Sequence, residues 1–201
     1  MNFLAHAYLS FNDPGALTGN MISDFVKGRK QFNYPPEIQR GIMLHRLIDT
    51  FTDEHPATAE AKQPFRPAYR LYSGAFVDVI YDHFLANDPD EFPGDELAAF
   101  SQKTYATLRK YSTWFPAPFF VMFPYMQEHD WLYNYRTRDG IGKSLHSVVR
   151  RAIYLTESET AMKLLDKHYQ LLQDCYRHFW KDLKSYALEQ YTLLTEYGGN
   201  N

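Results

Sequence analysis

Apolar residues recur at helical spacing along most of the chain, and runs that alternate apolar and polar residues, as strands do, are nearly absent. The pattern is clearest between residues 161 and 194. Because about 3.6 residues complete a helical turn, this spacing gathers apolar side chains on one stripe that can pack against a core. The chain is therefore predicted to be an all-α helical bundle. The stripe comprises Ala161, Leu165, Tyr169, Leu172, Tyr176, Phe179, Leu183, Tyr186 and Leu194.

Proline and glycine residues divide this pattern into successive helices. Pro14 falls at an early helical position, where its missing N–H is harmless, and Gly28 is a stop signal. Pro35-Pro36 opens a third helix, and Pro56 marks its limit. Helices are predicted over residues 2–9, 14–27, 36–55, 66–86 and 95–112, short helices and turns over 114–135, and a last helical element that a capping box of Thr156 and Glu159 opens.

Length and composition bound the remaining possibilities. A chain of 201 residues can bury one substantial core, and neither a repeat nor a linker divides it, so residues 1–201 are expected to form a single domain. A net charge of −3 lacks the broad basic field that non-specific nucleic-acid binding needs. The single cysteine, Cys175, excludes an internal disulfide and a cysteine-based zinc site. No signal peptide and no run of roughly 18 apolar residues is evident, which predicts a soluble cytoplasmic protein that does not bind membranes.

Two helical segments carry titratable residues four positions apart. His45 and Asp49 share one face of the third predicted helix, and Asp78 and Asp82 share one face of another. If these faces pack together, they supply four ligands to one ion. Imidazole with carboxylate oxygens suits Mn²⁺, Fe²⁺, Zn²⁺ or Mg²⁺. A shared metal would also neutralise carboxylates that apolar neighbours would otherwise bury at high cost.

Each further candidate also has a simpler structural interpretation. His6 is either a ligand or a hydrogen-bonded core residue, and Asp24 is either a ligand or a surface residue near a helix end. His83 follows Asp82 and could orient a ligand rather than bind the ion. His55 precedes Pro56 and could cap the next helix. Charges four residues apart are also common on solvated helical faces, so spacing alone leaves both interpretations open.

Four sequence blocks, in this order, resemble those of the acyl carrier protein phosphodiesterases. They are "MNFLAHAYLS", "GNMISDFVKG", "GIMLHRLIDTFTDEHP" and "VDVIYDHFLA". The resemblance is strong over residues 1–87 and continues to the C-terminus. It implies an enzyme that hydrolyses 4′-phosphopantetheine from holo-acyl carrier protein, uses a divalent cation, typically Mn²⁺ with Mg²⁺ or Fe²⁺ as alternatives, and has an HD-phosphohydrolase-like fold.

The sequence departs from the family pattern at two places: Ser23 stands where the family often has glycine, and "AHAYLS" lacks a second histidine. The resemblance also implies where the site lies. Because the carrier protein is acidic, a basic segment next to Asp24 is predicted to bind it. The predicted metal ligands are Asp24, His45, Asp49, Asp78 and Asp82, the predicted catalytic residues are Asp24, His83 and His6, and the predicted partner-binding residues are Lys27, Arg29 and Lys30, with Arg46, Arg66 and Arg70 extending the patch.

Two alternatives compete with this hypothesis. The first is an HD-like metal phosphohydrolase that uses the same ligands on a nucleotide or another small phosphoester. No glycine-rich phosphate loop is present, which weakens triphosphate use in particular. The second is a non-enzymatic α-helical interaction protein whose buried charges are paired with one another.

Overall fold

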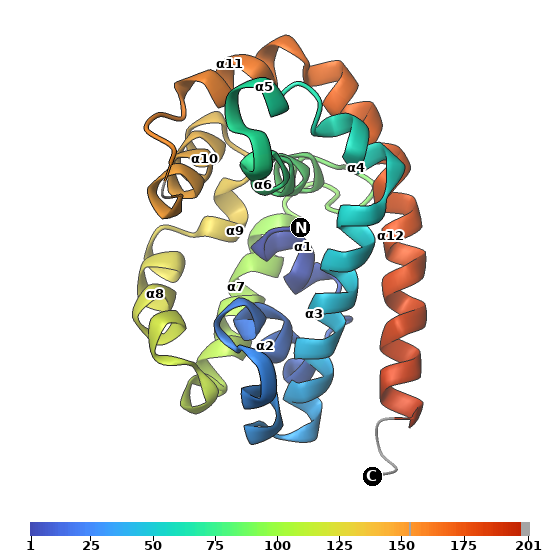
Figure 1. Ribbon diagram of the computed structural model, residues 1–201. Helices are drawn as coiled ribbons and strands as arrows, with labels where there is room; N and C mark the ends of the chain where they lie inside the picture. The colour runs from blue at the N-terminus through green and yellow to red at the C-terminus, as the bar shows by residue number, and fades with distance from the viewer. Residues whose placement is uncertain (153, 198–201) are drawn as a thin grey trace.

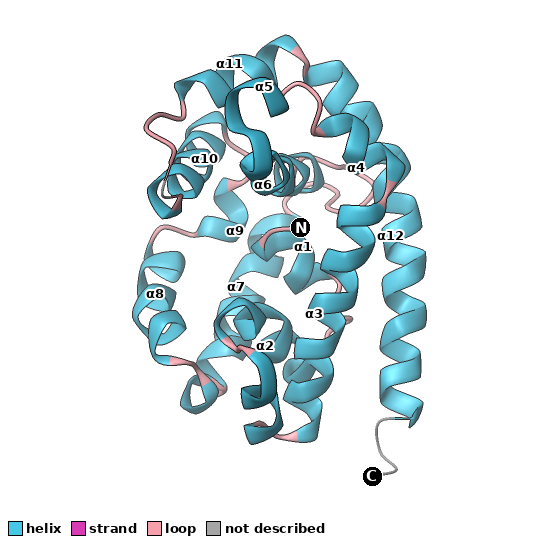
Figure 2. Ribbon diagram, viewed as in Figure 1, coloured by secondary structure: helices cyan, strands magenta, loops and turns pink. Residues whose placement is uncertain are grey.

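The computed structural model describes residues 1–152 and 154–197, and within these residues it contains helices and no strands, as Figure 2 shows. The prediction of an all-α protein is confirmed. The α-helices are α1 (Phe3–Tyr8), α2 (Pro14–Ile22), α3 (Pro36–Glu54), α4 (Pro56–Ala61), α5 (Arg66–Tyr69), α6 (Ser73–Ala86), α7 (Glu96–Lys110), α8 (Ala117–Glu128), α9 (Trp131–Asn134), α10 (Arg138–Arg151), α11 (Glu159–Lys167) and α12 (Tyr169–Tyr197), and the 3₁₀ helices are η1 (Ser23–Phe25), η2 (Gly28–Asn33), η3 (Arg70–Tyr72) and η4 (Ser112–Trp114).

Three predicted helices are shorter or more broken than expected. The helix predicted over 14–27 ends at Ile22, and the chain continues in the tighter turns of η1 and η2. The helix predicted over 66–86 is interrupted at Arg70, whose φ of 46° no α-helix accommodates. The predicted capping box is wrong, because Ser158 rather than Thr156 precedes α11, and the Thr160 N–H of the first turn donates to Glu157 Oε2 at 2.9 Å instead. The last element also divides at His168 into α11 and α12.

The segment 114–135 follows η4 and folds into α8 and α9, so it is helical as predicted, but α8 continues through Pro124 and is less interrupted than expected. Helix α10 was not predicted, although Thr137 caps its first turn by accepting a hydrogen bond from the Gly140 N–H. Such a cap is a helix-start signal that the sequence does carry. His55 caps α4 through its Nδ1, which accepts from the Ala57 N–H, as one of its two interpretations predicted.

Helices α2 and α3 cross at very close range. A Cβ added at Gly19 would lie 2.0 Å from the Ile38 carbonyl oxygen, and one added at Gly41 would lie 2.2 Å from the Ala16 carbonyl oxygen. Both distances are far below van der Waals contact, so only glycine permits this approach. The crossing brings the last turn of α2 against the middle of α3.

Other helices flank this pair. Figure 1 shows α12 along one edge, beside α3 and α4, and α8 on the opposite side. The N-terminus lies near the centre of the view, where α1 meets α3 and α6. One hydrophobic cluster runs through the described helices, with Tyr81, Tyr105 and Phe179 among its fully buried side chains. No helix of the described part combines the length and apolar character that a membrane span requires.

Candidate metal centre

Two histidine rings stack on each other at the point where α1 meets α3. The His6 and His45 centroids are 3.9 Å apart, and their planes differ by 16°. Both side chains are buried. Asn20, in the last turn of α2, contacts the Nδ1 atoms of both rings: its side-chain Oδ1 lies 2.8 Å from that of His6, and its backbone oxygen lies 2.8 Å from that of His45.

The opposite nitrogens of both rings face carboxylates. The two Asp49 oxygens divide between the histidines, one lying 3.2 Å from His6 Nε2 and the other 3.1 Å from His45 Nε2. An Asp24 oxygen lies 3.4 Å from His45 Nε2. These distances are short, yet neither Nε2 has hydrogen-bond geometry to any described residue. The two Nε2 atoms thus lie close to the oxygens of Asp24 and Asp49 without forming hydrogen bonds to them.

Charge and burial separate the two histidines. Burial, reinforced by the neighbouring His45, lowers the pKa of His6 to about 4, so His6 is neutral near pH 7. Burial alone would lower the pKa of His45, but the carboxylates of Asp24 and Asp49 outweigh it and raise that pKa to about 9. Contact with His45 lowers the pKa of Asp24. Burial opposes ionisation of Asp49, but the Met1 ammonium and both histidines hold its pKa well below the usual range.

The α-ammonium group of Met1 adjoins the same cluster. It lies 3.1 Å from an Asp78 oxygen and 3.5 Å from an Asp49 oxygen. Burial raises the pKa of Asp78, and the ammonium group offsets part of that effect. Asp78 is therefore linked to the centre through Met1, and in the described part of the chain no hydrogen bond or ion pair joins it to either histidine.

The donor set fits a divalent cation. Ligand atoms of His6, His45 and Asp49 all lie within 4.8 Å of one another, the only such group of three among the residues described. Two buried imidazole nitrogens without hydrogen bonds, facing carboxylate oxygens, form a mixed nitrogen and oxygen donor set that suits a divalent ion such as Zn²⁺, Fe²⁺ or Mn²⁺. The carboxylates lie on the solvent side: the side chain of Asp24 is 63% exposed and that of Asp49 is 41% exposed, so the cluster has an open rim over a buried floor.

The chain's relatives identify the kind of protein that carries this cluster. The family model for acyl carrier protein phosphodiesterase matches residues 1–183. The chain belongs to the acyl carrier protein phosphodiesterase family. A phosphodiesterase of this name from Yersinia pestis is 35% identical over 188 residues, which cover 93% of this chain and 97% of the relative. Those from Salmonella paratyphi A and Salmonella dublin are each 34% identical, with the same coverage.

Membership of the acyl carrier protein phosphodiesterase family makes the chain an enzyme and removes the non-enzymatic alternative. No solved structure matches the chain, so its likeness to HD-type phosphohydrolases stays a prediction.

Two residues in the fourth family-like block lie away from the cluster. Asp82 is fully buried and accepts hydrogen bonds from the backbone N–H groups of Asn2, Leu4 and Ala5, at 3.3, 2.7 and 3.3 Å. Its oxygens therefore hold the first turn of α1 rather than facing the histidines. Burial raises the pKa of Asp82 to about 7 in spite of these bonds.

His83 points in another direction from α6. Its Nδ1 lies 2.7 Å from the Tyr135 carbonyl oxygen beyond α9, and its ring packs against Phe84 and Tyr169. The structure does not bring His83 to the metal centre. Its predicted catalytic role has no geometric support, whereas His6, predicted for the same role, lies in the centre itself.

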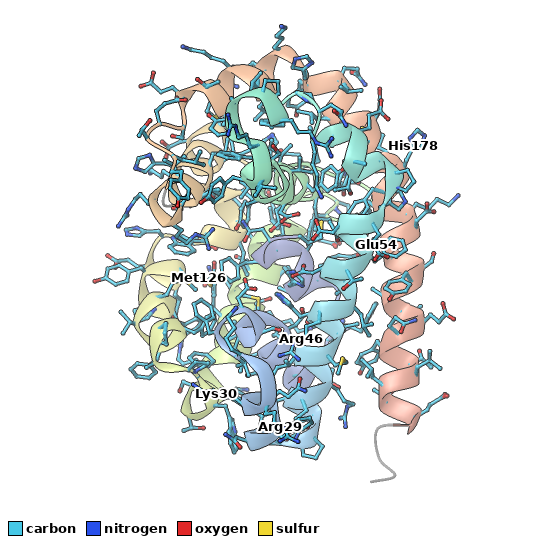
Figure 3. The ribbon with its side chains drawn as sticks, in the orientation of Figure 1. Arg29, Lys30, Arg46, Glu54, Met126 and His178 are labelled. Atoms are coloured by element: carbon cyan, nitrogen blue, oxygen red, sulfur yellow. The ribbon has the colours of Figure 1, made fainter. Side chains whose placement is uncertain are left out.

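The basic segment predicted to bind the partner directly follows Asp24 and is exposed. Lys27, Arg29 and Lys30 form no salt bridge with any described residue. Arg46 anchors the segment instead of extending it, because it donates hydrogen bonds to Gln31 Oε1 and to the Val26 carbonyl oxygen. Figure 3 shows Arg29 and Lys30 at the lower end of the molecule. Helix α5 lies at the opposite end of the same view, so Arg66 and Arg70 do not belong to this patch.

Sequence reasoning missed two groups that contact the centre. Asn20 is the third residue of the block "TGNMISDF", and nothing in its spacing separates it from an ordinary helical asparagine. Its place in the sequence, after Gly19 and four residues before Asp24, does not distinguish it, and its burial is seen only in the structure. The Met1 amine is a backbone group and has no side-chain pattern to detect.

Proposed function

We propose that this enzyme hydrolyses holo-acyl carrier protein to the apo form and that a divalent cation, Mn²⁺ first among those to test, supports the reaction. The observation that carries the proposal is the convergence of two unpartnered buried Nε2 atoms on the carboxylate of Asp49. Family membership supports the substrate, since relatives covering almost the whole chain bear that name. The residues proposed to hold the cation are His6, Asp24, His45 and Asp49.

The bond to be broken is the phosphodiester between a serine of the carrier protein and 4′-phosphopantetheine. Water oxygen bonds to phosphorus while the serine oxygen leaves and takes up a proton, which yields apo-carrier protein and the phosphorylated arm. A divalent cation, when bound, supplies Lewis-acid chemistry: it stabilises charge on the phosphoryl oxygens and acidifies a neighbouring water.

The chain's own residues would hold the cation and orient the attacking water. His6 and His45 form the floor of the centre, and Asp49 spans the two rings. Asp24 stands at the exposed rim, so its carboxylate is the group best placed to accept a hydrogen bond from the attacking water. Asp78 holds the Met1 ammonium beside Asp49 and so keeps a positive charge at the edge of an acidic cluster.

The carrier protein would approach over η2. It is acidic, and the exposed cations Lys27, Arg29 and Lys30 begin three residues after Asp24. Arg46 fixes this segment to α3, the helix that also carries His45 and Asp49. Docking there would place the partner's serine near the rim, with long-range attraction accelerating encounter.

The test is incubation of the purified enzyme with holo-acyl carrier protein and Mn²⁺, followed by intact-mass measurement of the carrier. We expect loss of the phosphopantetheine mass with the wild-type enzyme. His45→Ala and Asp24→Ala should abolish turnover while keeping the helical circular dichroism signal. Asp53→Ala is the matched control, because Asp53 lies one turn beyond Asp49 on α3 but pairs with Lys62. Its turnover should match the wild type.

Two results would overturn the proposal. One is an unchanged carrier mass with Mn²⁺, Mg²⁺ and Fe²⁺ in turn, and the other is wild-type turnover by His45→Ala. Hydrolysis of nucleotides or other small phosphoesters with an untouched carrier would favour the HD-like phosphohydrolase alternative.

A further inference from the structure

We infer that Asn20 is a positioning residue that makes both histidines of the metal centre present Nε2 to the cation, an inference that rests on the proposed function of that centre. Asn20 is fully buried in the last turn of α2. Its side chain and its backbone each contact a different histidine. One residue thus links α1, which carries His6, with α3, which carries His45.

The orientation of the Asn20 amide follows from its neighbours. Its Nδ2 lies 2.9 Å from the His6 carbonyl oxygen, which can only accept a hydrogen bond. Ser10 Oγ donates its own proton to the same carbonyl and accepts from Nδ2 at 3.2 Å. The NH₂ group must therefore face His6 O, and Oδ1 must face His6 Nδ1.

This arrangement decides which nitrogen of His6 carries the proton. Oδ1 of Asn20 can only accept, so Nδ1 of His6 must donate across the 2.8 Å separation. In the neutral ring, Nε2 is then unprotonated and its lone pair is free to bind a cation. Across a 2.8 Å separation, the backbone oxygen of Asn20 likewise makes Nδ1 of His45 the donor, so Nε2 is the nitrogen that gives up its proton when a cation binds. Histidines that bind metals commonly donate the other ring N–H to such an acceptor.

The two contacts respond differently to substitution. A change at residue 20 removes the side-chain oxygen that holds His6 but leaves the backbone oxygen that holds His45. Asn20→Ala should therefore release His6 alone. Asn20→Asp keeps an oxygen acceptor for His6 Nδ1, although it replaces the amide donor to the His6 carbonyl and Ser10 by a carboxyl oxygen. Because the acceptor is what fixes His6, this variant should recover most of the Mn²⁺ affinity that Asn20→Ala loses.

The experiment measures Mn²⁺ affinity by titration, with the wild type, Asn20→Ala, Asn20→Asp and Thr18→Val. Thr18 is a matched control: it is fully buried on the same helix, and its hydroxyl bonds only to the Pro14 carbonyl. We expect Asn20→Ala to weaken Mn²⁺ binding by about 10- to 100-fold. Asn20→Asp should remain within a few-fold of the wild type, and Thr18→Val should lower the melting temperature without changing Mn²⁺ affinity. Wild-type affinity in Asn20→Ala would overturn the inference.

A second measurement needs neither metal nor turnover. Ring ¹⁵N chemical shifts of the metal-free wild type at pH 8 should show His6 protonated at Nδ1, and Asn20→Ala should lose that preference. A wild-type His6 protonated at Nε2 would overturn the inference even if Asn20→Ala fails to fold. Absence of Mn²⁺ binding by the wild type would instead contradict the proposed function, while the ¹⁵N shifts would still decide the role of Asn20.

Discussion

Gly19 of α2 lies so close to Ile38 of α3 that a Cβ at residue 19 would stand 2.0 Å from the Ile38 carbonyl oxygen. This contact fixes the position of Asn20 relative to His45, because Asn20 is the next residue on α2. The metal centre therefore depends on a helix crossing that is outside the centre itself.

Gly19→Ala should force the two helices apart. We expect a loss of roughly 1–3 kcal/mol in unfolding free energy, as for overpacked cores, and weaker Mn²⁺ binding. Denaturant unfolding and metal titration measure the two effects. Gly142→Ala is the control: its Cβ would meet only the Met162 sulfur at 3.9 Å, and alanine favours the helix by about 0.5–1 kcal/mol. Equal stability of the two variants would contradict a tight crossing.

Mn²⁺ affinity should rise with pH. His45 has a pKa of about 9, so below that pH it carries a proton that a cation must displace. His6, with a pKa of about 4, is already neutral. The apparent dissociation constant should fall by about tenfold per pH unit between pH 6 and 8. Calorimetric titration at three pH values, in buffers of different ionisation enthalpy, would detect the released proton. A constant affinity across this range would contradict the assignment of His45 as a ligand.

The unfolding free energy of the metal-free protein should depend on pH through the ionisation of Asp82. Its pKa of about 7 in the folded state lies above the ordinary aspartate value of 3.8, so between these pH values the native state binds a proton that the unfolded state has lost. The stabilisation from this proton is complete below about pH 4 and is lost as pH rises through 7. The Asp82→Asn side chain cannot titrate, so in this variant the unfolding free energy should fall less as the pH rises through 7. Urea unfolding at pH 5 and pH 7.5, with a chelator present, makes the comparison; identical pH dependence in both proteins would refute it.

Charge reversal in the basic segment should impair binding of the carrier protein rather than chemistry. The combined variant Lys27→Glu, Arg29→Glu and Lys30→Glu should raise KM by roughly tenfold or more at low ionic strength, with little change in kcat. The effect should shrink as salt is added. Arg66→Glu with Arg70→Glu is the control, since these cations lie at the other end of the molecule. Equal KM values for the two variants would exclude η2 as the docking surface.

The sequence predicted the helical architecture well because apolar spacing reports directly on which face of each helix is buried. It failed where local backbone conformation decides. Arg70 breaks the helix predicted over 66–86 by adopting a positive φ, and arginine gives no warning of that conformation. The division at His168 interrupts an apolar stripe whose period continues on both sides.

The candidate site shows the same limit. His45 and Asp49, four residues apart, do face a common point, as their spacing predicted. Asp78 and Asp82 have the same spacing but do not face a common point. Asp78 contacts the Met1 ammonium group, whereas the oxygens of Asp82 accept hydrogen bonds from N–H groups at the start of α1. Spacing specifies the face of a helix; the element that packs on that face decides what its carboxylates bind. For the same reason, no pattern in the sequence revealed Asn20.

The most direct test of the metal centre is anomalous diffraction from crystals of the protein grown with Mn²⁺. We expect one strong peak at bonding distance from the Nε2 atoms of His6 and His45 and from an Asp49 oxygen. A peak elsewhere, or none at these atoms under saturating Mn²⁺, would contradict the proposed centre.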